Sequence, residues 1–349
     1  MGARATARAV ARRVATASTA RAGAGSRRAG AWAGAGAILR ACVLDEDEET
    51  FVVFDASGSA RVGKARDGRA VTLVDVAAFA ARSDEALDVV RGPYWSCARA
   101  GRGRALVGTS GRTLLECAWD ERGIERRVDD DGLPLKALGP HTGYVRDVVV
   151  SRDGTRAWSC ACNFAPSWRA RDDGAFEATG DVLKLFTGDI LRLALCERAG
   201  ETLVFCGVAD GTVRAFDATK SPADDLGVVG GDETITRGRV SALCTVNDEW
   251  VVSGCHDGVV TTHLARSTRG AAVASRTLDG KVQDIVVLYD GRVIVAGSFG
   301  VVVYDCAERL NLVDDAFGGV RSAVRSLAKT ANSVIVGSAV GDVFIIPYR

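Results

Sequence analysis

One short pattern constrains the fold of this chain more than any other feature. Residues 201–220 read ETLVFCGVADGTVRAFDATK, in which an apolar run of β-forming residues leads into Asp210-Gly211 and alternating apolar residues lead out of it. Asp tolerates the turn conformation, and Gly supplies a positive φ without a Cβ clash. The segment therefore predicts a strand, a tight turn and a second strand.

Six other segments repeat this pattern. Three are close copies, VVSGCHDGVV, VIVAGSFGVVVYD and VIVGSAVGDVFII, and three earlier ones are weaker. The spacing between successive turns falls from 53 to 41 residues, which approaches the roughly 40 to 45 residues of one four-stranded propeller blade. Solenoids of helix pairs have similar repeat lengths. The apolar residues of these units, however, alternate at every second position, which indicates strands and not amphipathic helices. The sequence thus predicts an all-β, seven-bladed β-propeller of four-stranded antiparallel blades, with turns centred on Gly58, Gly111, Asn163, Gly211, Gly258, Gly300 and Gly341.

The first 36 residues differ in composition from the rest. They contain seven Arg and no acidic residue, and Arg4, Arg8 and Arg12 recur at helical spacing. This is typical of an organelle transit peptide, and equally of a disordered basic tail in a chain rich in Ala, Arg and Gly. We therefore expect one of these over residues 1–36 and the propeller over residues 37–349. The remaining 37 Lys plus Arg face 44 Asp plus Glu, a net charge of −7 that disfavours a nonspecific nucleic-acid binder.

The ten cysteines favour a reduced, buried state. Five lie within apolar strand runs, where a free thiol behaves as a small hydrophobe: Cys160, Cys196, Cys206, Cys244 and Cys255. We expect an intracellular protein, in the cytoplasm or nucleus if the N-terminal tract is retained and in a mitochondrion or plastid if it is a transit peptide. No apolar stretch approaches the roughly 18 residues that span a bilayer, so no membrane span is expected.

The third unit carries a polar constellation. His141 follows Leu138-Gly139-Pro140 before an inner strand, and Ser159, Asn163 and Trp168 come after it. This unit resembles the WD-repeat β-propeller family, whose units have Gly-His before the inner strand and Trp-Asp after the third; GTVRAFD in the fourth unit matches the third strand, with Phe for Trp. The resemblance implies a structural hydrogen-bond network, to which we assign His141, Ser159, Asn163, Trp168, Asp210 and Asp257.

Two regions break the repeat. Residues 75–92 fit either one face of an inserted helix or an irregular blade edge. The last unit begins near Val324 and supplies three strands before Arg349. The resemblance implies that the N-terminus donates the missing outer strand, but the tract before Ala37 is rich in Gly and Ala, which form strands poorly. We expect an incomplete last blade unless this tract closes it.

Motifs for catalysis are scarce. The three histidines fall at the network position, in a turn and on a strand: His141, His256 and His263. Cys160 and Cys162 share a strand face, but no second cysteine pair follows at zinc spacing. We therefore predict a noncatalytic protein that requires neither a cofactor nor a metal.

Cations recur where the inner strands begin. In the resembled family, the residues before and after the first hydrophobic position of each inner strand face the ligand-binding end of the ring. Taking Val145, Leu193, Val240, Val282 and Val324 as that position gives a partner-binding set of Tyr144, Arg146, Arg192, Arg239, Lys281 and Arg325. Five cations and a Tyr then surround one mouth of an otherwise acidic body.

These features predict a protein–protein interaction scaffold that binds an acidic peptide or protein segment at this mouth. Arg suits bidentate contacts to carboxylate, and Tyr144 suits an anchor. The expected partners are proteins within a multiprotein complex, and not nucleic acid. Two alternatives stay open: a propeller hydrolase or lyase with carboxylates at the central channel, and an organellar assembly factor. Convergent buried acids in a deep pocket favour chemistry, whereas a shallow charged rim favours binding.

Overall fold

A computed structural model of the chain describes most of its length. The described residues are 27–31, 36–46, 49–65, 69–71, 93–101, 103–118, 135–139, 141–185, 188–198, 200–230, 238–266, 272–313, 320 and 322–348. Residues 75–92, for which the sequence allows a helix or a blade edge, lie outside these ranges.

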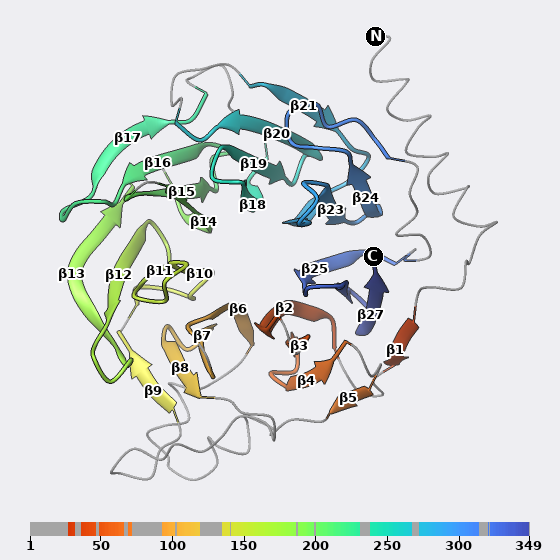
Figure 1. The fold of residues 1–349 in the computed structure, drawn as a ribbon, viewed down its shortest axis with the longest axis horizontal. Helices are drawn as coiled ribbons and strands as arrows, with labels where there is room; N and C mark the ends of the chain where they lie inside the picture. The colour runs from red at the N-terminus through yellow and green to blue at the C-terminus, as the bar shows by residue number, and fades with distance from the viewer. Residues whose placement is uncertain are drawn as a thin grey trace.

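Seven antiparallel sheets are arranged in a ring around a central axis, which makes the protein a seven-bladed β-propeller (Figure 1). The sheets follow one another in chain order, and we number them blades 1 to 7. Blades 1 to 3 consist of β2 (Ile38–Asp45), β3 (Thr50–Asp55), β4 (Ala60–Lys64) and β5 (Arg69–Val71); β6 (Tyr94–Arg99), β7 (Arg104–Thr109), β8 (Leu114–Ala118) and β9 (Leu135–Leu138); and β10 (Asp147–Val150), β11 (Arg156–Cys160), β12 (Phe164–Ala170) and β13 (Phe176–Lys184).

Blades 4 to 7 continue the ring with the same strand order from the centre outwards. They consist of β14 (Ile190–Arg198), β15 (Glu201–Val208), β16 (Val213–Asp217) and β17 (Asp224–Val228); β18 (Val240–Val246), β19 (Trp250–Cys255), β20 (Val259–Leu264) and β21 (Ala274–Thr277); β22 (Val282–Val287), β23 (Val293–Gly297) and β24 (Gly300–Tyr304); and β25 (Val324–Lys329), β26 (Ser333–Ser338), β27 (Asp342–Pro347) and β1 (Arg27–Ala31).

The core is divided into seven apolar clusters, each shared by two neighbouring blades. Strand β3 shows how period two produces this division. Its Val52 and Phe54 pack against blade 2, whereas Phe51 and Val53 pack against blade 7. Because successive side chains point to opposite faces of a sheet, one apolar strand serves two interfaces. Each blade is therefore stabilised by both of its neighbours.

A glycine near the end of the second strand permits this close packing. A Cβ atom on Gly254 would lie 2.4 Å from Cγ1 of Val282 in the next blade, and one on Gly207 would lie 2.6 Å from Cγ1 of Val240. These glycines belong to the repeated motif seen in the sequence. Their role is to let the first residue of the next inner strand approach the backbone.

The ring closes through the N-terminal tract. Strand β1 pairs antiparallel with β27, with Arg28 opposite Phe344, so the last blade has four strands. The expected boundary at residue 37 thus lies beyond a strand that belongs to the propeller. Among the described residues, the blade with three strands is instead the sixth, where the part of the segment after β24 that the structure describes forms an isolated bridge between Tyr304 and Leu312. Backbone pairing at the open edge of β27 outweighs the low strand propensity of Gly and Ala.

The inner strands share an irregularity at their second residue. In six blades the pairing register shifts there, for example between Ile190 and Arg192 in β14 and between Val240 and Ala242 in β18. Such a bulge breaks the alternation of side chains between the two faces. It determines which residues face the mouth of the ring and which face the channel.

The ten cysteines are free thiols in the structure, and seven are buried. Of the five predicted in apolar strands, four are buried and Cys244 is half-buried. Across the residues that the structure describes, no helix is long and apolar enough to cross a membrane.

Candidate partner-binding face

One end of the ring is formed by the starts of the inner strands and the turns between the second and third strands. These two features are joined by backbone hydrogen bonds. The amide of His256 in the turn of blade 5 donates to the carbonyl of Arg239 at 3.0 Å, and the amide of Ser298 in blade 6 donates to the carbonyl of Lys281 at 3.0 Å. Arg239 and Lys281 therefore lie beside the turns of their own blades, at the mouth of the ring.

Of the four residues that the sequence places directly before an inner strand, three lie at that position and one does not. Tyr144, Arg239 and Lys281 directly precede Val145, Val240 and Val282, which are fully buried. In blade 4 the equivalent buried residue is Ile190 and not Leu193, because the bulge lies between Ile190 and Arg192. The alignment on Leu193 therefore took Arg192, and not Asp189, as the residue before the strand. Asp189 directly precedes Ile190. Arg192 lies two residues after Ile190, further towards the channel.

Arg192 is nevertheless part of the cationic group. A Cβ atom on Gly207 would lie 3.4 Å from the Cβ of Arg192 and 2.6 Å from Val240, which places Arg192 beside the start of blade 5. The turn that carries His256 also packs on the loop that leads from blade 5 to blade 6, since a Cβ atom on Gly258 would lie 2.7 Å from the carbonyl oxygen of Gly280. Cations from blades 4, 5 and 6 thus surround this turn.

The imidazole of His256 is affected by these cations. Burial lowers its pKa below the ordinary value, and repulsion from Arg239, Lys281 and Arg192 lowers it further, while the adjacent Asp257 acts in the opposite direction. A positive potential at this point follows from the three cations together. The mouth is therefore electropositive around blade 5, although the folded part of the chain carries an excess of acidic residues.

In blade 3 the cation is held between two aromatic rings. The guanidinium carbon of Arg146 lies 5.4 Å from the centroid of the Trp95 ring and 5.5 Å from that of Tyr144. The side chain of Tyr144 is 48% exposed. Cation–π contacts of this kind restrict the guanidinium while leaving its donors available. This pair combines an anchored charge with an exposed aromatic surface.

Arg325 completes the set on the bulge of β25 in blade 7, where it is exposed. The cations thus come from five consecutive blades, 3 to 7, and we call them the cationic crescent: Arg146, Arg192, Arg239, Lys281 and Arg325. Within the described residues, none of the five has a carboxylate at ion-pair distance, whereas cations elsewhere do, such as Arg104 with Glu116 and Arg214 with Asp225. The crescent is free to accept an external anion.

An ionic group that the sequence did not reveal joins the inner strands of three blades. Arg40 of blade 1 lies 3.6 Å from Asp147 of blade 3 and 3.6 Å from Asp284 of blade 6. Both carboxylates are also bound by backbone amides of the next blade: Asp147 accepts from the amide of Leu193 at 3.0 Å, and Asp284 accepts from that of Leu327 at 2.8 Å. These contacts link five blades around the axis.

The polar network of blade 3 is largely as the family resemblance implies. Nε2 of His141 is 2.8 Å from Oγ of Ser159, and Nε1 of Trp168 donates to the same oxygen at 2.8 Å. Asn163 instead donates to the carbonyl of Leu185 at 2.8 Å, and Nδ1 of His141 is buried without a hydrogen-bond partner. Burial lowers the pKa of His141 to about 4, an effect that the nearby backbone of Arg112 opposes. Its imidazole is therefore neutral at physiological pH.

The two aspartates before the turn glycines have a local role. Oδ1 of Asp210 accepts from the amide of Thr212 at 2.9 Å, and Oδ1 of Asp257 accepts from that of Val259 at 3.2 Å. Such bonds fix the turn conformation. Asp210 and Asp257 therefore act within their own hairpins.

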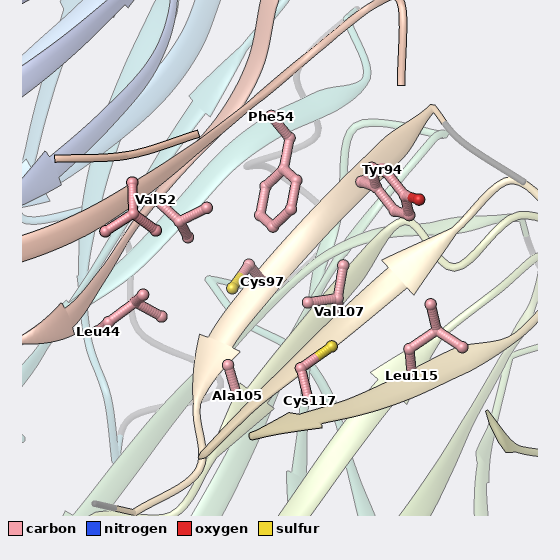
Figure 2. A pocket seen from close by; sticks show the side chains of 10 residues that line it. Leu44, Val52, Phe54, Tyr94, Cys97, Ala105, Val107, Leu115 and Cys117 are labelled. Carbon is pink, nitrogen blue, oxygen red and sulfur yellow. The ribbon is translucent and has the colours of Figure 1, made fainter. Parts of the chain in front are cut away.

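The described residues enclose cavities of different character. An apolar gap of about 30 Å³ lies between blades 1 and 2, where Leu44, Val52 and Phe54 face Cys97, Val107 and Leu115 (Figure 2). It has room for about one water molecule. Two larger hollows lie at blade 3. One of about 290 Å³ is on the outer wall next to blade 4, and one of about 210 Å³ is at the same end of the ring as the crescent. Among the described residues, no group of His, Cys, Asp and Glu is arranged to hold a metal ion.

The fold is shared with solved WD40 propellers. No protein-family model and no curated protein sequence matches the chain. The WD40 β-propeller domain of Doa1 aligns with a TM-score of 0.69 and 14% identity over 93% of this chain and 97% of that one. The WD40 repeats of RRP9 give 0.72 and 16% over 94% and 98%, and U3-55K gives 0.71 and 15% over 93% and 99%. At these identities the likeness concerns the fold alone.

Proposed function

We propose that this protein is a noncatalytic interaction scaffold whose cationic crescent binds an acidic segment of a partner protein. The observation that carries the proposal is the absence of a carboxylate partner, among the described residues, for cations on five consecutive blades, although residues 37–349 hold 44 acidic and only 37 basic residues. A rigid ring of stacked blades suits such multipoint binding. The WD40 fold is compatible with this role but does not specify it.

The charges have the chemistry that an acidic segment requires. Arginine donates two parallel hydrogen bonds to a carboxylate or phosphate. Arg146 is already restricted by Trp95 and Tyr144, so binding costs it less conformational entropy. An extended segment that follows the mouth would meet Arg239, Lys281 and Arg325 on successive blades, and Arg192 lies beside the start of blade 5, further towards the channel.

The alternative of a hydrolase or lyase needs carboxylates that are free to act in the channel. Two buried acids do converge there, but Arg40 and backbone amides bind them. These contacts hold the blades together, and this structural role accounts for the position of the two acids. We therefore favour binding at the mouth over catalysis in the channel. A role as an organellar assembly factor stays a prediction, because it concerns the cellular compartment in which the same scaffold acts.

Charge reversal tests the proposal. The triple variant R239E/K281E/R325E changes three exposed residues of the crescent, and R169E/K220E/R276E makes the same change in charge at exposed positions away from it. Fluorescence anisotropy with a degenerate library of acidic peptides should show the first variant weakened by on the order of 10- to 100-fold and the second little changed. Equal affinities for both variants would refute the crescent as the binding site.

A further inference from the structure

The hollow of about 210 Å³ at blade 3 adjoins the crescent. It is lined by His141, Thr142, Ala161, Phe164, Pro166 and Val182, which we call the blade-3 socket. Its walls come from the loop before β10, the turn between β11 and β12, and the two outer strands. The lining is largely apolar, and the side chain of Val182 at its edge is 49% exposed.

Local features of the sequence produce this socket. Pro166 faces Val182 across the two strands, and the register shifts between Pro166 and Trp168, where β13 has extra residues. This bulge interrupts the regular pairing of β12 with β13. On the other side, Gly143 allows the loop to approach the turn, since a Cβ atom there would lie 2.6 Å from Sγ of Cys162. The socket is therefore bounded by fixed backbone.

The size of the socket determines what it can hold. Small-molecule sites commonly have about 300 to 1,000 Å³, and this hollow is smaller. It suits one aliphatic side chain, which gains free energy by leaving water. His141 adds no charge to the lining, because burial lowers the pKa of its imidazole to about 4. A charged side chain would meet no residue of opposite charge among those that line the socket.

The position of the socket ties it to the crescent. Thr142 lines the socket, Tyr144 follows two residues later, and Arg146 two residues after that. Since a residue spans at most about 3.3 to 3.6 Å, Thr142 and Arg146 are no more than about 14 Å apart. A partner segment in extended conformation covers this distance with about four residues. The exposed ring of Tyr144 lies between the two sites along the chain.

We propose that the blade-3 socket receives one aliphatic side chain of the acidic protein segment that binds the crescent, within about four residues of a carboxylate contacting Arg146. This inference rests on the proposed function and adds the partner's second recognition element. The adjoining positive charge selects acidic segments, and the socket selects those with a leucine, isoleucine, valine or methionine at the right spacing.

A peptide library on the full chain tests the spacing. Degenerate acidic peptides with a fixed central Glu are labelled with fluorescein, and either Leu or Ser is placed at each neighbouring position in turn. Burying a leucine should tighten binding roughly 10- to 100-fold relative to serine at the favoured spacing. Equal binding of the Leu and Ser peptides, with acidic peptides still preferred over basic ones, would overturn the socket and leave the crescent intact.

Two matched variants separate the socket from the general surface. V182Q replaces the exposed apolar edge, and V340Q replaces another exposed valine, 69% exposed, in the turn of blade 7 at the same end of the ring. V182Q should remove most of the leucine advantage and leave serine peptides unaffected, while V340Q should change neither. A loss shared by both variants would contradict a specific socket.

Photo-crosslinking then locates the side chain directly. A peptide with photo-leucine at the favoured position should link to the residues that line the socket, Phe164 or Val182 in particular. Links confined to other blades would overturn the proposal. If acidic peptides bind no better than basic ones, the crescent itself is wrong and the socket proposal falls with it.

Discussion

Removal of Arg40 should destabilise the ring, because this residue neutralises two buried carboxylates at once. The side chains of Asp147 and Asp284 are only 4% and 10% exposed, and that of Arg40 is 20% exposed. At 3.6 Å and an effective dielectric constant of about 20, each pair contributes about 5 kcal/mol of Coulomb energy before desolvation. Breaking such a buried pair by removing one partner costs about 3 to 5 kcal/mol.

We expect R40M to lower the free energy of unfolding by about 3 kcal/mol, the lower end of that range, because the guanidinium keeps some contact with water. Methionine retains the aliphatic stem, so the loss reports the charge. R40K should be intermediate, since one ammonium cannot reach both acids as a forked guanidinium does. The triple variant R40M/D147N/D284N should recover part of the loss because it leaves no unpaired charge.

The assay is equilibrium urea unfolding of the four proteins, followed by tryptophan fluorescence and circular dichroism. Coincident transitions would support treating each curve with a single free energy. An R40M protein within about 0.5 kcal/mol of the wild type, the range of ordinary surface substitutions, would contradict a stabilising role for the charge of Arg40. It would mean that the backbone amides alone hold the two carboxylates.

Three further predictions concern the repeat, the polar network and ring closure. G254A should cost about 1 to 3 kcal/mol by overpacking, because its Cβ would lie 2.4 Å from Val282; an unchanged urea midpoint would count against this close packing. His141, with a folded pKa of about 4 against an ordinary 6.5, stays neutral while the unfolded chain gains a proton, so stability should fall between pH 6.5 and 4 by up to about 3 kcal/mol. The H141N variant should lack that part of the pH dependence. Identical pH profiles for H141N and the wild type would exclude this contribution of His141. Deletion of residues 2–31 should lower stability by about 2 kcal/mol through lost pairing with β27, whereas deletion of residues 2–26 should not, and equal stability of the two proteins would show that β1 is dispensable.

Much of this fold could be predicted because its signal is local. Asp210-Gly211 and Asp257-Gly258 form the tight hairpins that the dipeptides indicate, and the apolar runs beside them are buried strands. The same turn recurs at a spacing near one blade, so the number of blades follows from counting. The His141, Ser159 and Trp168 contacts were accessible through resemblance to a family with the same network.

The features that escaped prediction depend on contacts between distant parts of the chain. Arg40 meets acids in blades 3 and 6, which no local spacing indicates. Strand β1 forms because an open sheet edge is available to it, although its composition is unfavourable. Arg192 was assigned to the position before the inner strand because Leu193 was aligned with Val240 and Val282, whereas Ile190 occupies that position in the structure. Ile190, like Val240 and Val282, is the first residue of its inner strand, so an alignment on the strand starts gives the correct position.

The blade-3 socket was also beyond sequence reasoning. Its apolar residues lie in two strands and a loop, and nothing in their spacing distinguishes them from the core. The hollow depends on where the outer strands leave regular pairing. By contrast, the recurring cations before the inner strands were visible in the sequence, and the structure shows which lie at the rim.

Hydrogen–deuterium exchange on the full chain, with and without the tightest-binding acidic peptide, tests the crescent most directly. If an acidic segment binds at the crescent, the peptide should protect the amides in the turns at residues 256–258 and 298–299 and at the starts of β18 and β22. The turns at the opposite end of the ring, such as residues 247–249 and 289–291, should exchange as before. Protection confined to that opposite end or to the outer strands would contradict the proposal that an acidic segment binds at the cationic crescent.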